Sequence, residues 1–143
     1  MVRIFSTKTT GRVVVARLEP GEDILKSIEK IIQTQSIISG HLSLIGAVSK
    51  VHLGYFNREE NTYRDFAVEE DLEIVSCVGN IAKHEKGHIV HAHLVASDAN
   101  GKCYGGHLME GCVVSVTIEV VITEFPKMAR TRDAATGLNL LDL

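Results

Sequence analysis

The run HIVHAHLVASDANGKCYGGHL, which spans residues 88–108, gives the most specific structural pattern in this chain. It reads as two short strands, residues 88–97 and 102–108, separated by Asp98-Ala99-Asn100-Gly101. Asp, Asn and Gly favour tight turns, because their backbones reach left-handed conformations at little cost. The run therefore predicts an antiparallel β-hairpin.

Histidines are concentrated in this predicted hairpin. The chain has seven in 143 residues, and four of them are His88, His91, His93 and His107. Successive side chains of a strand point to opposite faces. His91 and His93 therefore share one face, whereas His88 has the opposite parity and points away.

The turn decides whether His107 joins that face. A three-residue loop with Gly101 left-handed sets Asp98 opposite Lys102 and His93 opposite His107, and facing residues lie on the same side of a sheet. A two-residue type I′ turn at Asn100-Gly101 shifts the register by one and turns His107 to the far face, unless a bulge at 105–106 restores it. Both registers are compatible with the sequence.

Three imidazoles on one face are typical of a zinc site. His91, His93 and His107 would leave the fourth coordination position open, as in catalytic or ligand-binding sites rather than closed structural ones. Glu110 and Glu119 are candidate helpers to a metal-bound water, with a surface or salt-bridged role as the alternative for each. The sequence offers no such partners to the other histidines, which are His41, His52 and His84.

The rest of the chain predicts many strands and one main helix. Ile24, Ile28 and Ile31 recur at helical spacing behind the acids Glu22 and Asp23, which predicts an amphipathic helix over residues 22–35. β-Branched and aromatic runs predict further strands, at residues 13–18, 40–46, 47–56, 62–68, 72–82 and 113–124. We therefore expect an α+β fold, a largely antiparallel sheet packed with one helix, as a single domain over residues 1–143.

Composition excludes several classes of protein. The chain is 45% hydrophobic and carries a formal net charge of −3, so neither disorder nor a strongly basic nucleic-acid binder is indicated. The apolar runs are too short to span a membrane. Residues 1–10 contain no apolar stretch of signal-peptide length, so we expect a cytoplasmic protein. Its cysteines are then expected as free thiols, Cys77 as a buried hydrophobe and Cys103 and Cys112 near the histidines.

The chain resembles the plant-and-prokaryote conserved (PPC) domain family, in its stand-alone prokaryotic form. The resemblance runs nearly end to end, and its most specific part is GGHLMEG at residues 105–111 with HAHL at 91–94. Further matching segments are RLEPGED at 17–23, GAV at 46–48, LGYF at 53–56, GNI at 79–81, Asp98 with Gly101, and Glu119.

This resemblance implies a homotrimer, and it implies metal binding by His91, His93 and His107 as in some prokaryotic members. Plant relatives bind AT-rich DNA chiefly through an AT-hook. This chain has no Arg-Gly-Arg-Pro core, and Gly11-Arg12 is the nearest fragment, so DNA binding is doubtful. The histidine pattern also looks like the zinc site of acetolactate decarboxylase, a related fold.

Three functions follow as hypotheses. The first is a metal-binding protein that holds zinc, or alternatively another divalent metal, with an unknown small or anionic ligand at the metal. The second is a metal-dependent lyase or decarboxylase, which an arginine aimed at the metal would favour, with Arg17, Arg130 and Arg132 as candidates. The third is a DNA-associated regulatory module, which a contiguous basic face would favour.

Overall fold

The predicted hairpin lies within a large sheet. The structure is a computed structural model that describes residues 2–8 and 10–143. Strands β5 (Gly87–Ser97) and β6 (Cys103–Leu108) pair antiparallel, with His93 opposite His107. The Asp98 N–H donates to the Lys102 carbonyl at 2.9 Å, and the Gly101 N–H donates to the Asp98 carbonyl at 3.0 Å. Gly101 has φ +81°, so the turn is the three-residue loop, and of the two registers the structure has the one that joins His107 to His93.

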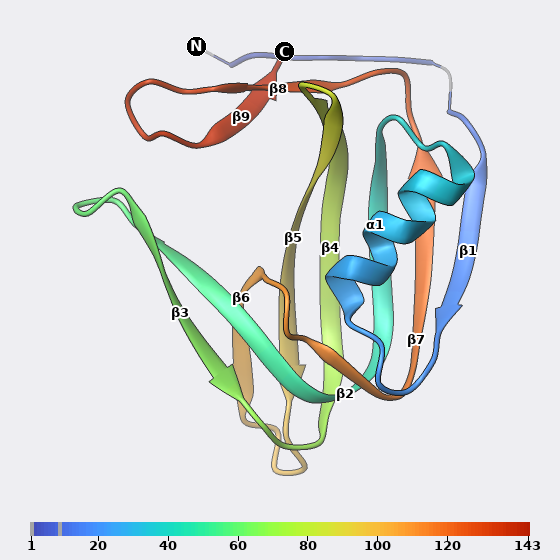
Figure 1. Cartoon of the computed structure of the whole chain (residues 1–143), viewed down its shortest axis with the longest axis vertical. Helices are drawn as coiled ribbons and strands as arrows, with labels where there is room; N and C mark the ends of the chain where they lie inside the picture. Colours follow the sequence, from blue (N-terminus) through green and yellow to red (C-terminus); the bar gives the residue numbers. More distant parts are fainter. Residues whose placement is uncertain (1, 9) are drawn as a thin grey trace.

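The longest strand, β2 (Gly40–Asn57), belongs to two parts of the sheet. Its first half pairs with β4 (Leu72–His84) and β7 (Val113–Glu124), and its second half pairs mainly with β3 (Thr62–Val68) and β6. The register shifts beside Gly46, whose φ of +141° is costly for residues with a Cβ. Beyond this irregularity, β2 leaves β4 and β7 after residue 50, pairs with β3 from residue 51 and turns away from β7 (Figure 1).

Strands β2, β4, β5 and β6 form a closed ring. Each pairs antiparallel with the next, and β6 returns to β2 at residues 53–54. Strand β7 extends the sheet beyond β2, and β1 (Val13–Leu18) pairs antiparallel with β7. In the described part of the chain the one parallel pairing joins Lys83 of β4 to Ala129. The sheet is thus largely antiparallel, as the sequence predicts.

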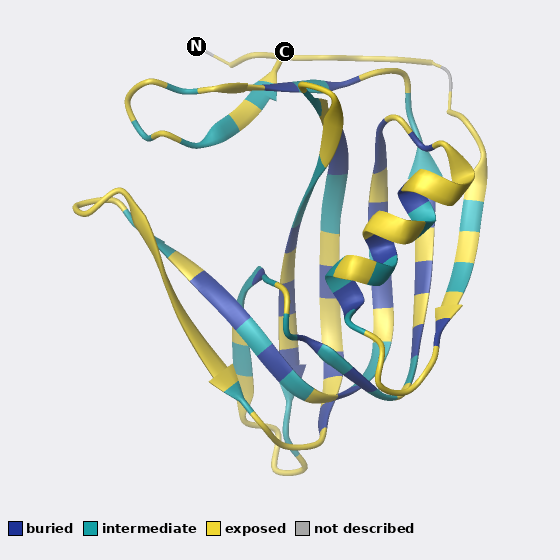
Figure 2. Ribbon diagram, in the orientation of Figure 1, coloured by how far each residue is buried: buried dark blue, intermediate teal, exposed yellow. Residues whose placement is uncertain are grey.

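Helix α1 (Ile24–Gln35) covers one face of the sheet. Asp23 caps it, because its carboxylate accepts from the Lys26 N–H at 3.0 Å, so the helix begins two residues after the predicted start. Ser36, with φ 55°, ends it. Figure 1 shows the helix packed across the strands, and Figure 2 shows its buried residues on the side toward them. The expected α+β fold, with one amphipathic helix on an antiparallel sheet, is confirmed.

The hydrophobic core lies between α1 and the sheet. Its isoleucines from the helix meet alternate residues of the strands, and burial of each such side chain is worth about 1.5–3 kcal/mol. Fully or almost fully buried members are Ile24, Ile28, Ile32, Leu42, Val48, Leu53, Ile81, Leu94, Ile118 and Ile122. On β5, Ala92 and Leu94 face this core, which turns His91 and His93 to the opposite side of the strand.

A second hairpin, which was not predicted from the sequence, follows β7. Strands β8 (Ala129–Arg132) and β9 (Asn139–Asp142) pair antiparallel. The buried Ser39 hydroxyl fixes the start of β8, since it accepts from the Met128 N–H at 2.8 Å and donates to the Met128 carbonyl at 3.1 Å. This attachment brings Arg130 to the edge of the β4–β5 pair. Within the described residues, no helix is both long and apolar enough to cross a membrane.

Candidate metal centre

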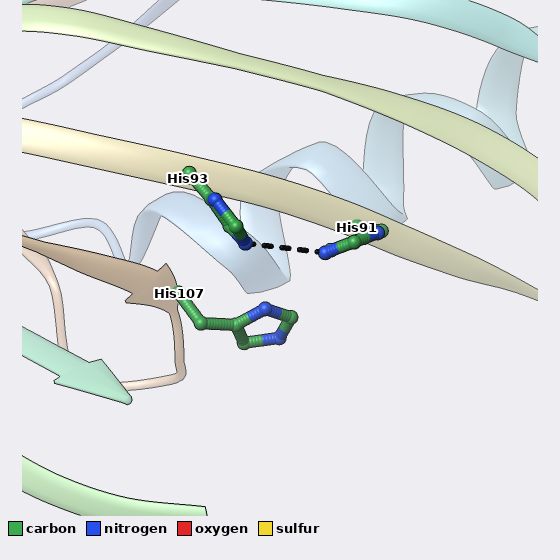
Figure 3. A group of neighbouring side chains, drawn as sticks. All are labelled: His91, His93 and His107. Atoms are coloured by element: carbon green, nitrogen blue, oxygen red, sulfur yellow. Dashed lines mark hydrogen bonds between the residues drawn. The ribbon is translucent and has the colours of Figure 1, made fainter. Parts of the chain in front are cut away.

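Three histidines converge on one face of the β5–β6 hairpin. His91 and His93 come from β5 and His107 from β6, and their nearest ring nitrogens all lie within 4.8 Å of one another. Figure 3 shows the three rings turned toward a common point. The two-residue parity of β5 and the register set by the turn at 98–102 together produce this arrangement. His88, with the opposite parity, is exposed and outside the cluster.

The spacing of the rings suits a small metal ion. Nε2 of His91 lies 3.2 Å from Nε2 of His93. Two ligands of a tetrahedral zinc ion with bonds of about 2.0–2.1 Å stand about 3.3 Å apart. The ring centroid of His107 is 5.1 Å from that of His91 and 5.6 Å from that of His93. The His107 Nδ1 is buried and has no hydrogen-bond partner.

The surroundings of His91 and His107 favour the neutral form of these two rings, which is the form of an imidazole that binds metals. Burial, aided by the nearby His91, His93 and Arg130, lowers the pKa of His107 to about 4. Burial also lowers the pKa of His91, with Arg130 and His93 contributing in the same direction. At neutral pH these two rings are therefore available as ligands without competition from protons.

Small residues bring the strands close enough to form the site. A Cβ at Gly79 of β4 would collide with the His91 carbonyl and with Ala92. A Cβ at Gly106 would lie 2.8 Å from the Gly54 carbonyl of β2. These two glycines hold β5 and β6 against their neighbours and so fix the backbone that carries the histidines.

Two residues from other strands complete the surroundings. The ring of Tyr63 on β3 lies 5.0 Å from that of His107. Arg130 on β8 is 7% exposed, and its Nη2 lies 3.5 Å from Nδ1 of His91. A cavity of about 210 Å³ opens between these side chains and the histidines. Arg130 was one of three candidate arginines in the sequence analysis. No local pattern predicted its contact with His91, because the two residues are 39 positions apart in the sequence.

A histidine bridge that the sequence missed lies nearby. His52 Nδ1 is 2.6 Å from the Glu110 carbonyl, and its Nε2 is 2.5 Å from the Asp65 carboxylate. Both ring nitrogens face acceptors, so the ring donates at both when it is protonated. The hydrogen bond to Asp65, aided by the Glu110 carbonyl, raises the pKa of His52. The bridge ties β2 and β3 to the loop that follows β6.

The other predicted residues lie outside the cluster. The Glu110 carboxylate pairs with Lys26 at 3.2 Å, and Glu119 is exposed on β7 opposite Arg17 of β1. Arg17 pairs with Glu19, and Arg132 is exposed. All three cysteines are free: Cys77 and Cys112 are buried, and Cys103 is exposed. Burial raises the pKa of Cys77 to about 12, in keeping with its expected role as a buried hydrophobe.

The donor set fits a zinc ion. It consists of three imidazoles, two of which have lowered pKa values, and a fourth position could be filled by water or by an added ligand. A bound zinc ion would supply a Lewis acid that polarises a carbonyl or carboxylate oxygen. His41, His84 and His88 do not belong to the cluster.

Comparison with known families gives one match over most of the chain. Residues 5–126 match the sequence profile of the Plants and Prokaryotes Conserved (PCC) domain. The bifunctional protein GlmU of a Synechococcus strain is 33% identical over 129 residues, which are 88% of this chain and 20% of that protein. The chain thus spans about a fifth of the length of this curated relative.

Solved structures show the same fold. A metal-containing protein from Archaeoglobus fulgidus has 30% identity and a TM-score of 0.86, over 97% of this chain and 98% of that one. A plant- and prokaryote-conserved (PPC) protein from Pyrococcus horikoshii has 26% identity and a TM-score of 0.89, over 99% and 98%. Acetolactate decarboxylase from Bacillus subtilis has 15% identity and a TM-score of 0.56, over 80% and 53%, a likeness of fold alone.

Proposed function

The chain belongs to the Plants and Prokaryotes Conserved domain family, and from that premise we propose that it is a metal-binding protein whose His91, His93 and His107 hold one zinc ion. The observation that carries the proposal is the convergence of these three rings, two of them with pKa values held below the ordinary value. The metal-containing relative from Archaeoglobus fulgidus supports it.

The metal would leave room for a ligand. Three protein donors leave a tetrahedral ion one position short, and the 210 Å³ cavity adjoins His91 and His107. In this proposal, the protein therefore binds a small molecule at the metal. Arg130 in the wall of the cavity favours the second candidate, a metal-dependent lyase acting on an anionic substrate, because such a substrate needs a charge partner.

The metal proposal is tested by elemental analysis. The purified protein is stripped with a chelator, reloaded with zinc and desalted, and it should then hold close to one zinc per chain. The double variant His91→Ala, His93→Ala should hold almost none. The control is His41→Ala, His88→Ala, which removes two exposed histidines outside the cluster and should hold as much as the wild type. Full zinc content in the first variant would contradict the proposal.

We further propose that the chain forms a homotrimer, a number of copies that rests on its resemblance to the plant-and-prokaryote conserved family. The face of the sheet away from α1 carries exposed apolar side chains, an unusual surface for a chain that stays alone in water. They include Val13, Val15, Ile45, Val75, Val78 and Val116, each at least half exposed. Light scattering should give three times 15.6 kDa, and a monomer at micromolar concentration would contradict the trimer.

A further inference from the structure

The guanidinium of Arg130 is buried without an anionic partner. Its side chain is 7% exposed, and none of the ion pairs formed within the described residues includes it. Its Nη1 donates to the Asn139 carbonyl at 2.7 Å, and its Nη2 donates to the Asn80 side-chain oxygen at 2.6 Å. Its Nε has no partner. A buried cation is costly unless a negative charge compensates it, so this arginine lacks a counterion.

The guanidinium of Arg130 lies next to His91. The Nε2 of His91 faces His93, so a metal held there leaves the proton of His91 on Nδ1. Metal-bound histidines usually donate that proton to a carboxylate or a carbonyl. Here Nδ1 faces Nη2 of Arg130 at 3.5 Å, which is itself a donor. With metal bound, two donors meet without an acceptor between them, and an oxygen of an anion would satisfy both.

The adjoining cavity limits the size and character of that anion. The cavity volume of about 210 Å³ is below the roughly 300–1,000 Å³ of sites for drug-sized ligands, which favours a small occupant. Arg130 is the one arginine or lysine in its wall, Tyr63 and Asn139 add polar groups, and Leu138 and Leu140 add apolar ones. His91 and His107 line it too, so an occupant contacts both the arginine and the metal ligands. These features fit a small organic acid.

We propose that this cavity binds a small organic acid, whose carboxylate pairs with Arg130 while a second oxygen faces the metal held by His91 and His107. The planar fork of an arginine matches a carboxylate or a phosphate. Among the described residues, the cavity wall holds one arginine and no lysine, and one positive charge balances the single charge of a carboxylate. The proposal rests on the proposed metal site. A 2-oxo acid the size of pyruvate has both oxygens and fits the volume.

Calorimetry on zinc-loaded protein tests the proposal, with pyruvate, acetate and inorganic phosphate as probes. Zinc content is measured first: protein that takes up no zinc refutes the metal proposal, whereas zinc-loaded protein that binds no pyruvate refutes this one alone. We expect pyruvate to bind at least tenfold more tightly than acetate, which lacks the second oxygen. Phosphate binding more tightly than pyruvate would overturn the choice of a carboxylate.

Variants on β8 test whether Arg130 itself, and not merely a positive charge on this strand, binds the acid. Arg130→Gln should keep its zinc and lose at least tenfold in pyruvate affinity, and Arg132→Gln, an exposed arginine on the same strand, should match the wild type. Arg130→Lys keeps the charge but not the fork, and should lose affinity several-fold even if the glutamine variant fails to fold. Wild-type pyruvate affinity in either folded Arg130 variant would overturn the proposal.

Discussion

Acid should destabilise the metal-free protein through His107. Its pKa is about 4 in the folded chain against an ordinary 6.5, so between these values the unfolded chain binds more protons than the folded one. By linkage, the free energy of unfolding then falls as the pH drops from 6.5 to 4, and it is fully retained above 6.5. The full difference is worth roughly 3.4 kcal/mol at about 1.36 kcal/mol per pH unit. Solvent screening of this partly exposed ring reduces the expected loss to about 1–2 kcal/mol.

The assay is urea denaturation of metal-free protein at several pH values from 7.5 to 4.5. Because other groups also titrate, the quantity to compare is the difference between the wild type and His107→Gln, which retains a polar side chain of similar length without the titration. As the pH falls below 6.5, the wild type should lose more stability than the variant. The difference between their free energies of unfolding should change by about 1 kcal/mol or more. His88→Gln, at an exposed position on β5, controls for the loss of a histidine outside the cluster. A difference in stability that is independent of pH would refute the assignment of a half-buried, neutral His107.

Three more results are expected. Gly46→Ala should lower the free energy of unfolding by about 1–3 kcal/mol or more in urea denaturation, because φ is +141° and a Cβ would collide with the Thr117 carbonyl. Wild-type stability would show that the register shift in β2 does not need glycine. Asp65→Asn should destabilise the protein by up to about 1 kcal/mol at pH 6 and by less at pH 9, because the raised pKa of His52 gives stability that is present below 6.5 and lost as the pH rises through the folded value; an equal loss at both pH values would argue against a charged bridge. Labelled AT-rich duplex should not bind at submicromolar concentration near physiological salt, since the net charge is −3 and no AT-hook is present; binding that prefers AT-rich over GC-rich duplex would overturn this.

The cluster of three histidines follows largely from local sequence rules. The alternation of side chains along a strand predicted that His91 and His93 share one face. The turn after Asp98 allowed two registers, one of which brings His107 to that face. The structure selects that register through Gly101, and through an Asp98 carboxylate that accepts from the N–H groups of Asn100 and Lys102. Helix α1 was likewise predictable, because its isoleucine spacing is local.

Contacts that depend on distant segments were not predictable. Arg130 reaches His91 only because Ser39 anchors the segment before β8, and no local pattern in residues 127–143 indicates that hairpin. The closed ring of strands depends on β2 pairing with both β4 and β6, which a list of strands does not specify. The His52–Asp65 contact could have been predicted from the sequence. The turn at 57–62 sets His52 opposite Ala67, so Asp65 is its diagonal neighbour.

Anomalous scattering at the zinc edge, from crystals of the zinc-loaded protein, shows directly whether the three histidines hold zinc. We expect one strong peak per chain, at about 2.0–2.1 Å from a ring nitrogen of each of His91, His93 and His107. Those three side chains should be its only protein ligands. A peak elsewhere, or crystals of zinc-loaded protein with no peak between these rings, would contradict zinc binding at this site.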